Sequence, residues 1–206
     1  QRRIYDERRK ETLPKHGIEI AILSYNDFNV NSQKRIIRNP EKDLEIALQL
    51  YEQAFPSEER RPAEQWVTTL TSGQTHPWTI LYGNSFAGFF ILWPMEGFIY
   101  GEHFAINSSL RGHGVGSRAL VLILESIKKP LIIEVEPPQS STIAQRRIAF
   151  YQRHGLHFCP KVYLQPPYRD SDKPFPLCLM SSDEKFINEQ FNNISKQIHR
   201  VVYGKT

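Results

Sequence analysis

The sequence predicts an α/β (α+β) domain in which a mixed, mainly antiparallel central sheet carries helices on both faces. Three observations lead to this fold class. Three strand-like runs follow one another between residues 77 and 106, which predicts an antiparallel meander. A strand, helix, strand unit follows over residues 97–136, and such a unit requires a parallel crossover in the same sheet. Several segments repeat apolar residues at helical spacing, which predicts helices packed on a sheet by one face.

A chain of 206 residues is long enough for one sizeable core. We expect three parts: an N-terminal extension over residues 1–33, the main domain over residues 34–181, and a C-terminal helical extension over residues 182–206. The extension at the N-terminus is polar, with one strand-like run, "IEIAILSY".

The main domain is expected to open with a short strand, "KRIIR", at residues 34–38. Asn39 and Pro40 then suit the cap and first position of a helix, which apolar residues from Leu44 to Phe55 continue at helical spacing. A second short helix is predicted from Ala63 to Gly73, because glycine readily adopts the left-handed conformation that ends helices.

The next elements follow in order along the chain. Strands are predicted at 77–83, 85–93 and 97–106, with hairpin turn chemistry at residues 83–85. A glycine-rich loop leads into a helix with apolar residues from Ala119 to Ile127. The remaining elements are a strand at 130–136, a helix at 143–155, strands at 156–164 and 177–181, and a helix at 183–202.

Composition excludes several classes of protein. The formal net charge is +4, but the first ten residues alone contribute +3, with five Arg or Lys against two Asp or Glu. Because the rest is nearly neutral, we expect no nucleic-acid partner; a basic arm that meets nucleic acid or an acidic surface is the weaker alternative. No apolar run is long enough to span a membrane. The two cysteines fit neither a disulfide scaffold nor a metal motif, so we expect a cytoplasmic protein without a metal.

The stretch "NSSLRGHGVGSRAL" concentrates three glycines, Gly112, Gly114 and Gly116, between a strand and a helix. Unpaired N–H groups and the helix dipole at such a junction favour an anionic phosphate, and Arg111 adds a full charge. Neither the Walker pattern nor the dinucleotide pattern G-x-G-x-x-G fits this spacing. The alternative is that the glycines only make a tight turn.

Arg111 to Gly116 fits R-x-x-G-x-G, and "RRIAFYQRHGLHF" follows about thirty-five residues later. These two motifs resemble the pyrophosphate loop [QR]-x-x-G-x-[GA] and the F-Y-x-x-x-G-[FL] signature of the GNAT superfamily of acyl-CoA-dependent N-acyltransferases. The resemblance covers residues 34–181 in element order. It implies a GNAT-type sheet in which a bulge in the fourth strand splays that strand from the fifth, and it implies acetyl-CoA as co-substrate.

The resemblance also implies which residues contact acetyl-CoA. The diphosphate would lie on the loop amides, and the pantetheine arm would pair with the free edge of the fourth strand, whose N–H groups can hold the thioester oxygen. The residues concerned are Phe104, Ala105, Ile106, Arg111, Gly112, His113, Gly114, Val115, Gly116 and Ser117. Ala144 replaces an Asn that usually precedes the second signature, which removes one familiar contact to CoA.

The reaction that the resemblance implies needs a base and an acid. An alkyl ammonium must lose a proton before it attacks, and a carboxylate whose pKa is raised by partial burial suits this role. Glu102 on the fourth strand and Glu134 and Glu136 on the fifth are the candidates, with water as the alternative. Tyr151, from the F-Y-x-x-x-G motif, is expected to protonate the departing thiolate, and the alternative for it is a core aromatic residue.

The acceptor is less well defined by the sequence. Glu58, Arg60 and Tyr168 lie in loops that shape the acceptor site in the family, but both charge signs are present, so neither a cationic nor an anionic acceptor is selected. We expect an N-acetyltransferase that acts on a small-molecule or peptide amine, as a monomer or homodimer. A module that binds acyl-CoA for regulation without transferring the acyl group is the alternative. Histidines 103, 113, 154 and 157 are expected at the surface or in loops.

Overall fold

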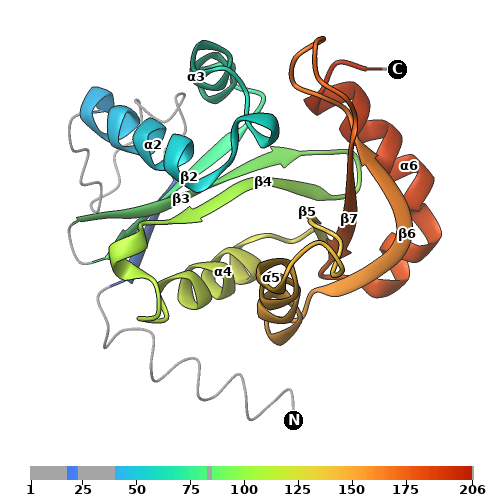
Figure 1. Ribbon diagram of the computed structural model, residues 1–206. Coiled ribbons are helices and arrows are strands. Elements are labelled where there is room, and N and C mark those ends of the chain that lie inside the picture. Colours follow the sequence, from blue (N-terminus) through green and yellow to red (C-terminus); the bar gives the residue numbers. More distant parts are fainter. Residues whose placement is uncertain (1–17, 23–39, 83–84, 206) are drawn as a thin grey trace.

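The computed structural model describes residues 18–22, 40–82 and 85–205, which form a mixed sheet of seven strands with helices on both faces (Figure 1). The predicted strand at residues 34–38, the cap Asn39 and the turn residues 83–84 lie outside the described residues. The strands are β1 (Ile18–Ile22), β2 (His76–Tyr82), β3 (Ser85–Pro94), β4 (Ile99–Ile106), β5 (Leu131–Val135), β6 (His157–Gln165) and β7 (Phe175–Ser181).

The order of strands across the sheet is β1-β2-β3-β4-β5-β7-β6. Strands β2, β3 and β4 form the predicted antiparallel meander, and β1 extends it by pairing antiparallel with β2. The β4–β5 pair is parallel, as the strand, helix, strand unit predicted, and β7 and β6 continue the sheet antiparallel. The mixed, mainly antiparallel fold class is therefore confirmed.

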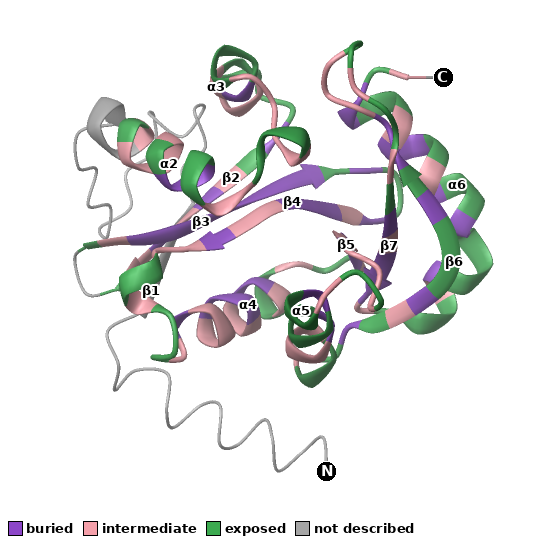
Figure 2. Cartoon of the chain, in the orientation of Figure 1, coloured by how far each residue is buried: buried purple, intermediate pink, exposed green. Residues whose placement is uncertain are grey.

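The helices are α2 (Pro40–Ala54), α3 (Ala63–Thr71), α4 (Val115–Ser126), α5 (Thr142–Arg153) and α6 (Glu184–Val202), with short 3₁₀ turns η3 (Ser57–Glu59) and η4 (Ser108–Leu110). Alternate residues of β3 enter two different cores. Phe89 packs in the core shared with α2, α3 and α6, and Phe90 packs in the core shared with α4 and α5. The buried inner faces of these layers are seen in Figure 2.

Helix α6 buries one apolar face. Ile187, Phe191, Ile194 and Ile198 are buried at regular helical spacing, whereas Val201 is 40% exposed. This face packs in the core that α6 shares with β3, α2 and α3. Tyr203, which follows the helix, is buried in the same core. No helix within the described ranges is long and apolar enough to cross a membrane.

The feature that positions the site is a break between β4 and β5. These strands pair only over Ile99–Gly101 of β4, and the rest of β4 has no partner on that side. The register of β4 against β3 shifts at the same point, because His103 is an extra residue with φ 58°, the one positive φ outside glycine among the described residues. The predicted bulge and splay are thus present, and they open a backbone edge.

Candidate active site

A cleft of 780 Å³ follows the open edge of β4. It begins at the glycine loop, passes between the separating ends of β4 and β5, and ends against the segment that joins α2 to η3. Loop and strand edges are where unpaired backbone groups are available, so the cleft offers N–H donors along its length. Among the residues predicted to contact acetyl-CoA, all but His113 line it: Phe104, Ala105, Ile106, Arg111, Gly112, Gly114, Val115, Gly116 and Ser117.

The glycine loop has the geometry of an anion site. Gly112 and Gly114 have φ of 81° and 76°, a conformation that L side chains rarely adopt. Gly114 directly precedes α4, whose first N–H groups lack helical partners. Arg118 also faces this turn: its Nη2 donates to the His113 carbonyl at 3.2 Å, while its buried Nη1 has no partner among the described residues. An unpaired guanidinium nitrogen beside free amides fits a phosphate group.

Tyr151 lies on α5 and lines the cleft where β4 and β5 separate. Its ring packs edge-on against Phe150 with centroids 5.2 Å apart. Burial raises the pKa of the Tyr151 hydroxyl to about 12, although Arg147 opposes the shift. The hydroxyl therefore stays protonated at neutral pH, which is the form that can donate a proton.

Glu102 is buried, but it is not the base of raised pKa that the sequence led us to expect. Its carboxylate accepts hydrogen bonds from Arg61 Nη2 at 3.1 Å, Trp93 Nε1 at 2.7 Å and Tyr168 Oη at 2.7 Å. Burial on its own raises the pKa, but Arg61, His103 and these hydrogen bonds outweigh it, so the pKa of Glu102 lies below its ordinary value. Glu102 is thereby held ionised and fixed in place.

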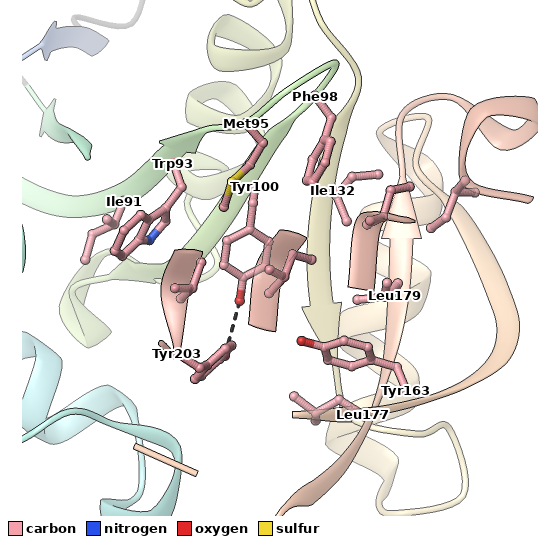
Figure 3. Packing of buried hydrophobic residues seen from close by; sticks show 14 of the residues in the cluster. Ile91, Trp93, Met95, Phe98, Tyr100, Ile132, Tyr163, Leu177, Leu179 and Tyr203 are labelled. Atoms are coloured by element: carbon pink, nitrogen blue, oxygen red, sulfur yellow. Dashed lines mark hydrogen bonds between the residues drawn. The ribbon is translucent and has the colours of Figure 1, made fainter. Parts of the chain in front are cut away.

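Glu134, another of the three candidate bases, is the carboxylate whose pKa burial raises. Its side chain faces the cleft from β5, and Tyr163 and Tyr203 donate hydrogen bonds to its two carboxylate oxygens, the second at 3.0 Å. Figure 3 shows Tyr163 and Tyr203 close to Tyr100, whose hydroxyl lies 3.5 Å from that of Tyr203. Burial raises the pKa of Glu134 to about 7, against the lowering effect of the tyrosine hydrogen bonds. The group can therefore exchange a proton near neutral pH.

Glu136 also lines the cleft, two residues further on, where it forms an ion pair of 2.8 Å with Arg147 on α5. Both partners are partly exposed, so the pair lies at the rim of the cleft.

A chain of tyrosine hydroxyl groups connects Glu134 to Glu102. Tyr203 donates to Glu134, its hydroxyl oxygen lies 3.4 Å from that of Tyr168, and Tyr168 donates to Glu102.

The structure brings only one of the three predicted acceptor residues into the cleft. Tyr168 lines it, whereas Glu58 is exposed and Arg60 pairs with Glu52 at 3.5 Å, and neither of the two lines the cleft. The arginine that reaches the buried network is Arg61, which no sequence pattern distinguishes from Arg60. Arg61 also donates to the Val202 carbonyl at 2.8 Å, which ties its loop to the end of α6.

His103 was expected at the surface or in a loop, and this was wrong. It is the bulge residue of β4, its side chain is only 5% exposed, and its ring meets Tyr51 and Phe55 edge-on. Tyr203 was also missed, because it follows the last helix at the end of the chain. No group of His, Cys, Asp and Glu in the described part of the chain can hold a metal ion.

The comparisons with known proteins agree with this geometry. The family model described as "Acetyltransferase (GNAT) family" matches residues 44–156, more than half of the chain. A solved structure named as a GNAT-family acetyltransferase from Bacteroides thetaiotaomicron is 31% identical, covers 91% of this chain and 99% of its own, and superposes with a TM-score of 0.79.

More distant relatives share shorter or weaker likeness. YjbC of Bacillus subtilis strain 168, named as an acetyltransferase, is 34% identical over 64 residues, which span 31% of this chain and 32% of that protein. The chain therefore matches about a third of the length of that curated relative. A Bacillus subtilis acetyltransferase solved in complex with CoA has the same fold at 13% identity, with a TM-score of 0.51 over 80% of this chain and 97% of its own.

Proposed function

The chain belongs to the acetyltransferase (GNAT) family, and from that premise we propose that it transfers the acetyl group of acetyl-CoA to a primary amine by direct attack. The observation that carries the proposal is the continuity of one cleft. The glycine loop, the open edge of β4, Tyr151 and Glu134 all line it, and these are the groups that the diphosphate, the pantetheine arm, the leaving thiolate and the amine would each need.

The donor end fits the diphosphate of CoA. Arg111, which lines the cleft, and the free amides at the start of α4 supply positive charge and hydrogen-bond donors, and Arg118 adds positive charge behind the turn. Gly112 has open space where a side chain would stand, so a bulky diphosphate can approach its backbone. The amides of Phe104 to Ile106, on the part of β4 without a β5 partner, would pair with the pantetheine arm and hold the thioester oxygen.

We assign the base to Glu134 and the acid to Tyr151. The substrate ammonium gives a proton to Glu134, and the amine nitrogen then attacks the thioester carbon. A C–N bond forms, the C–S bond breaks, and the leaving thiolate takes the hydroxyl proton of Tyr151. Tyr151 regains a proton from the new amide nitrogen through water, and Glu134 releases its proton to solvent. One ammonium and one thioester thus yield one N-acetylated amine, one thiol and one proton.

The other two carboxylates have supporting roles in this proposal. Glu102, held ionised by Arg61, fixes Tyr168 and the hydroxyl chain that leads to Glu134. Glu136 and Arg147 form part of the rim.

We also propose that residues 34–181 are the acyltransferase domain, with 1–33 and 182–206 as extensions. The free thiols Cys159 and Cys178 support a cytoplasmic location.

Binding and turnover test the proposal separately. Calorimetry is expected to detect CoA binding that Gly114→Asp abolishes, because the new carboxylate repels the diphosphate and the left-handed turn is strained. Gly73→Asp is the matched control, since Gly73 has the same φ of 76° but lies at the end of α3. Binding that survives Gly114→Asp would contradict the assignment.

Turnover is read as thiol release with a panel of primary amines. Tyr151→Phe is expected to lower kcat by about 10²-fold while CoA affinity stays within error, because the phenyl ring keeps the packing and loses only the proton. CoA binding without thiol release for any amine would instead favour a regulatory acyl-CoA-binding module.

A further inference from the structure

The part of the cleft beyond the separating strands is acidic. The carboxylates that line the cleft come from η3, β4, β5 and the residue after β5: Glu59, Glu102, Glu134 and Glu136. The arginines that line it come from the glycine loop and from α5: Arg111, Arg146 and Arg147. Arg111 lies at the donor end, and Arg147 is neutralised by its ion pair with Glu136, so negative charge predominates in the acceptor end.

The arginines of the acceptor loops are already engaged, which resolves the ambiguity left by their sequence. Arg60 pairs with Glu52 outside the cleft, Arg61 pairs with Glu102 behind its wall, and Arg169 pairs with an aspartate three positions on. Among the described residues, none of these cations is left to receive an anionic acceptor group.

His103 supplies an independent sign that a nitrogen donor binds here. Its Nε2 lies 3.0 Å from the carbonyl oxygen of Glu59, which can only accept, so Nε2 carries the hydrogen. Nδ1 is then an acceptor; it is buried and has no partner in the described structure, although the side chain lines the cleft. Burial lowers the pKa of His103, so the imidazole is neutral and Nδ1 remains an acceptor, 3.8 Å from the ionised Glu102 carboxylate, whose charge also favours a cationic donor here.

Glu59 stands beside His103 in this wall. Its carboxylate forms no ion pair with any described residue and lies near the Glu136–Arg147 pair, which leaves the group of three with net negative charge. Burial, with the neighbouring Glu136, raises the pKa of Glu59. A cation bound beside Glu59 would stabilise its ionised form against burial and would reduce its repulsion by Glu136.

We propose that the acceptor is a small dication without an anionic group: a primary amine that reacts beside Glu134, linked to a second cationic nitrogen held by Glu59 and His103. This inference rests on the proposed acetyl transfer and adds the substrate class. Glu134 takes the proton of the reacting nitrogen, while the second nitrogen stays charged and orients the chain that joins the two.

Three probes of equal chain length test the inference: putrescine, butylamine and γ-aminobutyrate, which carry at the far end a cation, a methyl group and an anion. We expect kcat/KM for putrescine to exceed that for butylamine by about tenfold, the equivalent of one well-placed charged contact, and γ-aminobutyrate to be the poorest. Glu59→Gln should cut the ratio of putrescine to butylamine by about fivefold or more. Glu58→Gln, a neighbouring exposed carboxylate that does not line the cleft, should leave the ratio unchanged.

The outcomes separate the inference from the proposed function. If all three probes are acetylated equally, or γ-aminobutyrate is preferred, acetyl transfer stands and the dication is excluded. A ratio that Glu59→Gln and Glu58→Gln change alike would also overturn the assignment to Glu59. If CoA binds and none of the three probes releases thiol, the panel of primary amines separates the two: thiol release with another amine leaves the proposed function standing and overturns the dication, whereas release with no amine overturns both.

Discussion

Replacing Glu134 with glutamine tests the base assignment most directly. The substitution keeps the size of the side chain and the oxygen that accepts from one tyrosine, but it removes the ionisable group. General base catalysis by a positioned side chain contributes about 10²–10⁴-fold. We therefore expect Glu134→Gln to lower kcat/KM by at least about 10²-fold, with unchanged affinity for CoA.

The pH dependence gives a sharper result. In the wild type, the base is competent only when it is ionised, so activity should rise with pH up to about 7. The amine substrate also ionises, but it contributes equally to both proteins. The ratio of wild-type to variant kcat/KM, measured from pH 5 to 9, cancels that contribution and should bend near 7. A ratio that is flat over this range would refute the assignment.

The same shift predicts a change in stability. The pKa of Glu134 is raised in the folded state, from 4.5 to about 7, so between these values the folded protein binds more protons than the unfolded chain. The stability of the wild type should therefore fall as pH rises through this window, by up to about 3 kcal/mol. Urea unfolding of Glu134→Gln should lack this component. An equal loss of stability with pH in both proteins would show that the carboxylate is not destabilised by burial.

Two further substitutions test the residues around the carboxylates. Tyr203→Phe removes a hydrogen bond that lowers the pKa of Glu134, so the bend in the pH profile of thiol release should move upward by about one pH unit. A downward shift, or no shift, would contradict the contact. Arg61→Met leaves the buried carboxylate of Glu102 without its cation, so urea unfolding should show a loss of about 3–5 kcal/mol, partly recovered in the double variant Arg61→Met/Glu102→Gln. A double variant no more stable than Arg61→Met would argue against the ion pair.

The sequence predicted the fold well because its signals are local. Gly73 has the positive φ that ends α3, and the continuous apolar run at residues 85–93 became β3, which is buried along most of its length. The bulge could not be located by periodicity, since an extra residue in a strand shows only as a shift in register against its partner. His103 was misjudged for this reason, because its burial depends on a positive φ, which is uncommon outside glycine and cannot be read from the sequence.

The sequence motifs located Gly112, Gly114 and Tyr151, which line the cleft. Residues whose place in the site depends on tertiary packing alone were not predicted. Glu102 and Glu134 occupy adjoining parts of one cleft, yet an arginine faces the first and tyrosines face the second. Those partners come from the loop before α3, from β6 and from the residue after α6, far away in sequence. Their identity sets the two pKa values in opposite directions, so no pattern within β4 or β5 could have distinguished a fixed charge from a base.

The adjacent residues Arg60 and Arg61 make the same point about the acceptor. Both precede α3 in the run "EERRP", and either can point toward the cleft as far as the sequence shows. Arg60 turns outward to Glu52 and Arg61 inward to Glu102, so both positive charges are neutralised by partners within the protein. In the sequence, the charges of this loop select neither a cationic nor an anionic acceptor. In the folded protein its arginines are paired, so the acceptor end of the cleft is acidic. Such a surface attracts a cation, which is also the ionic form in which an amine acceptor arrives at neutral pH.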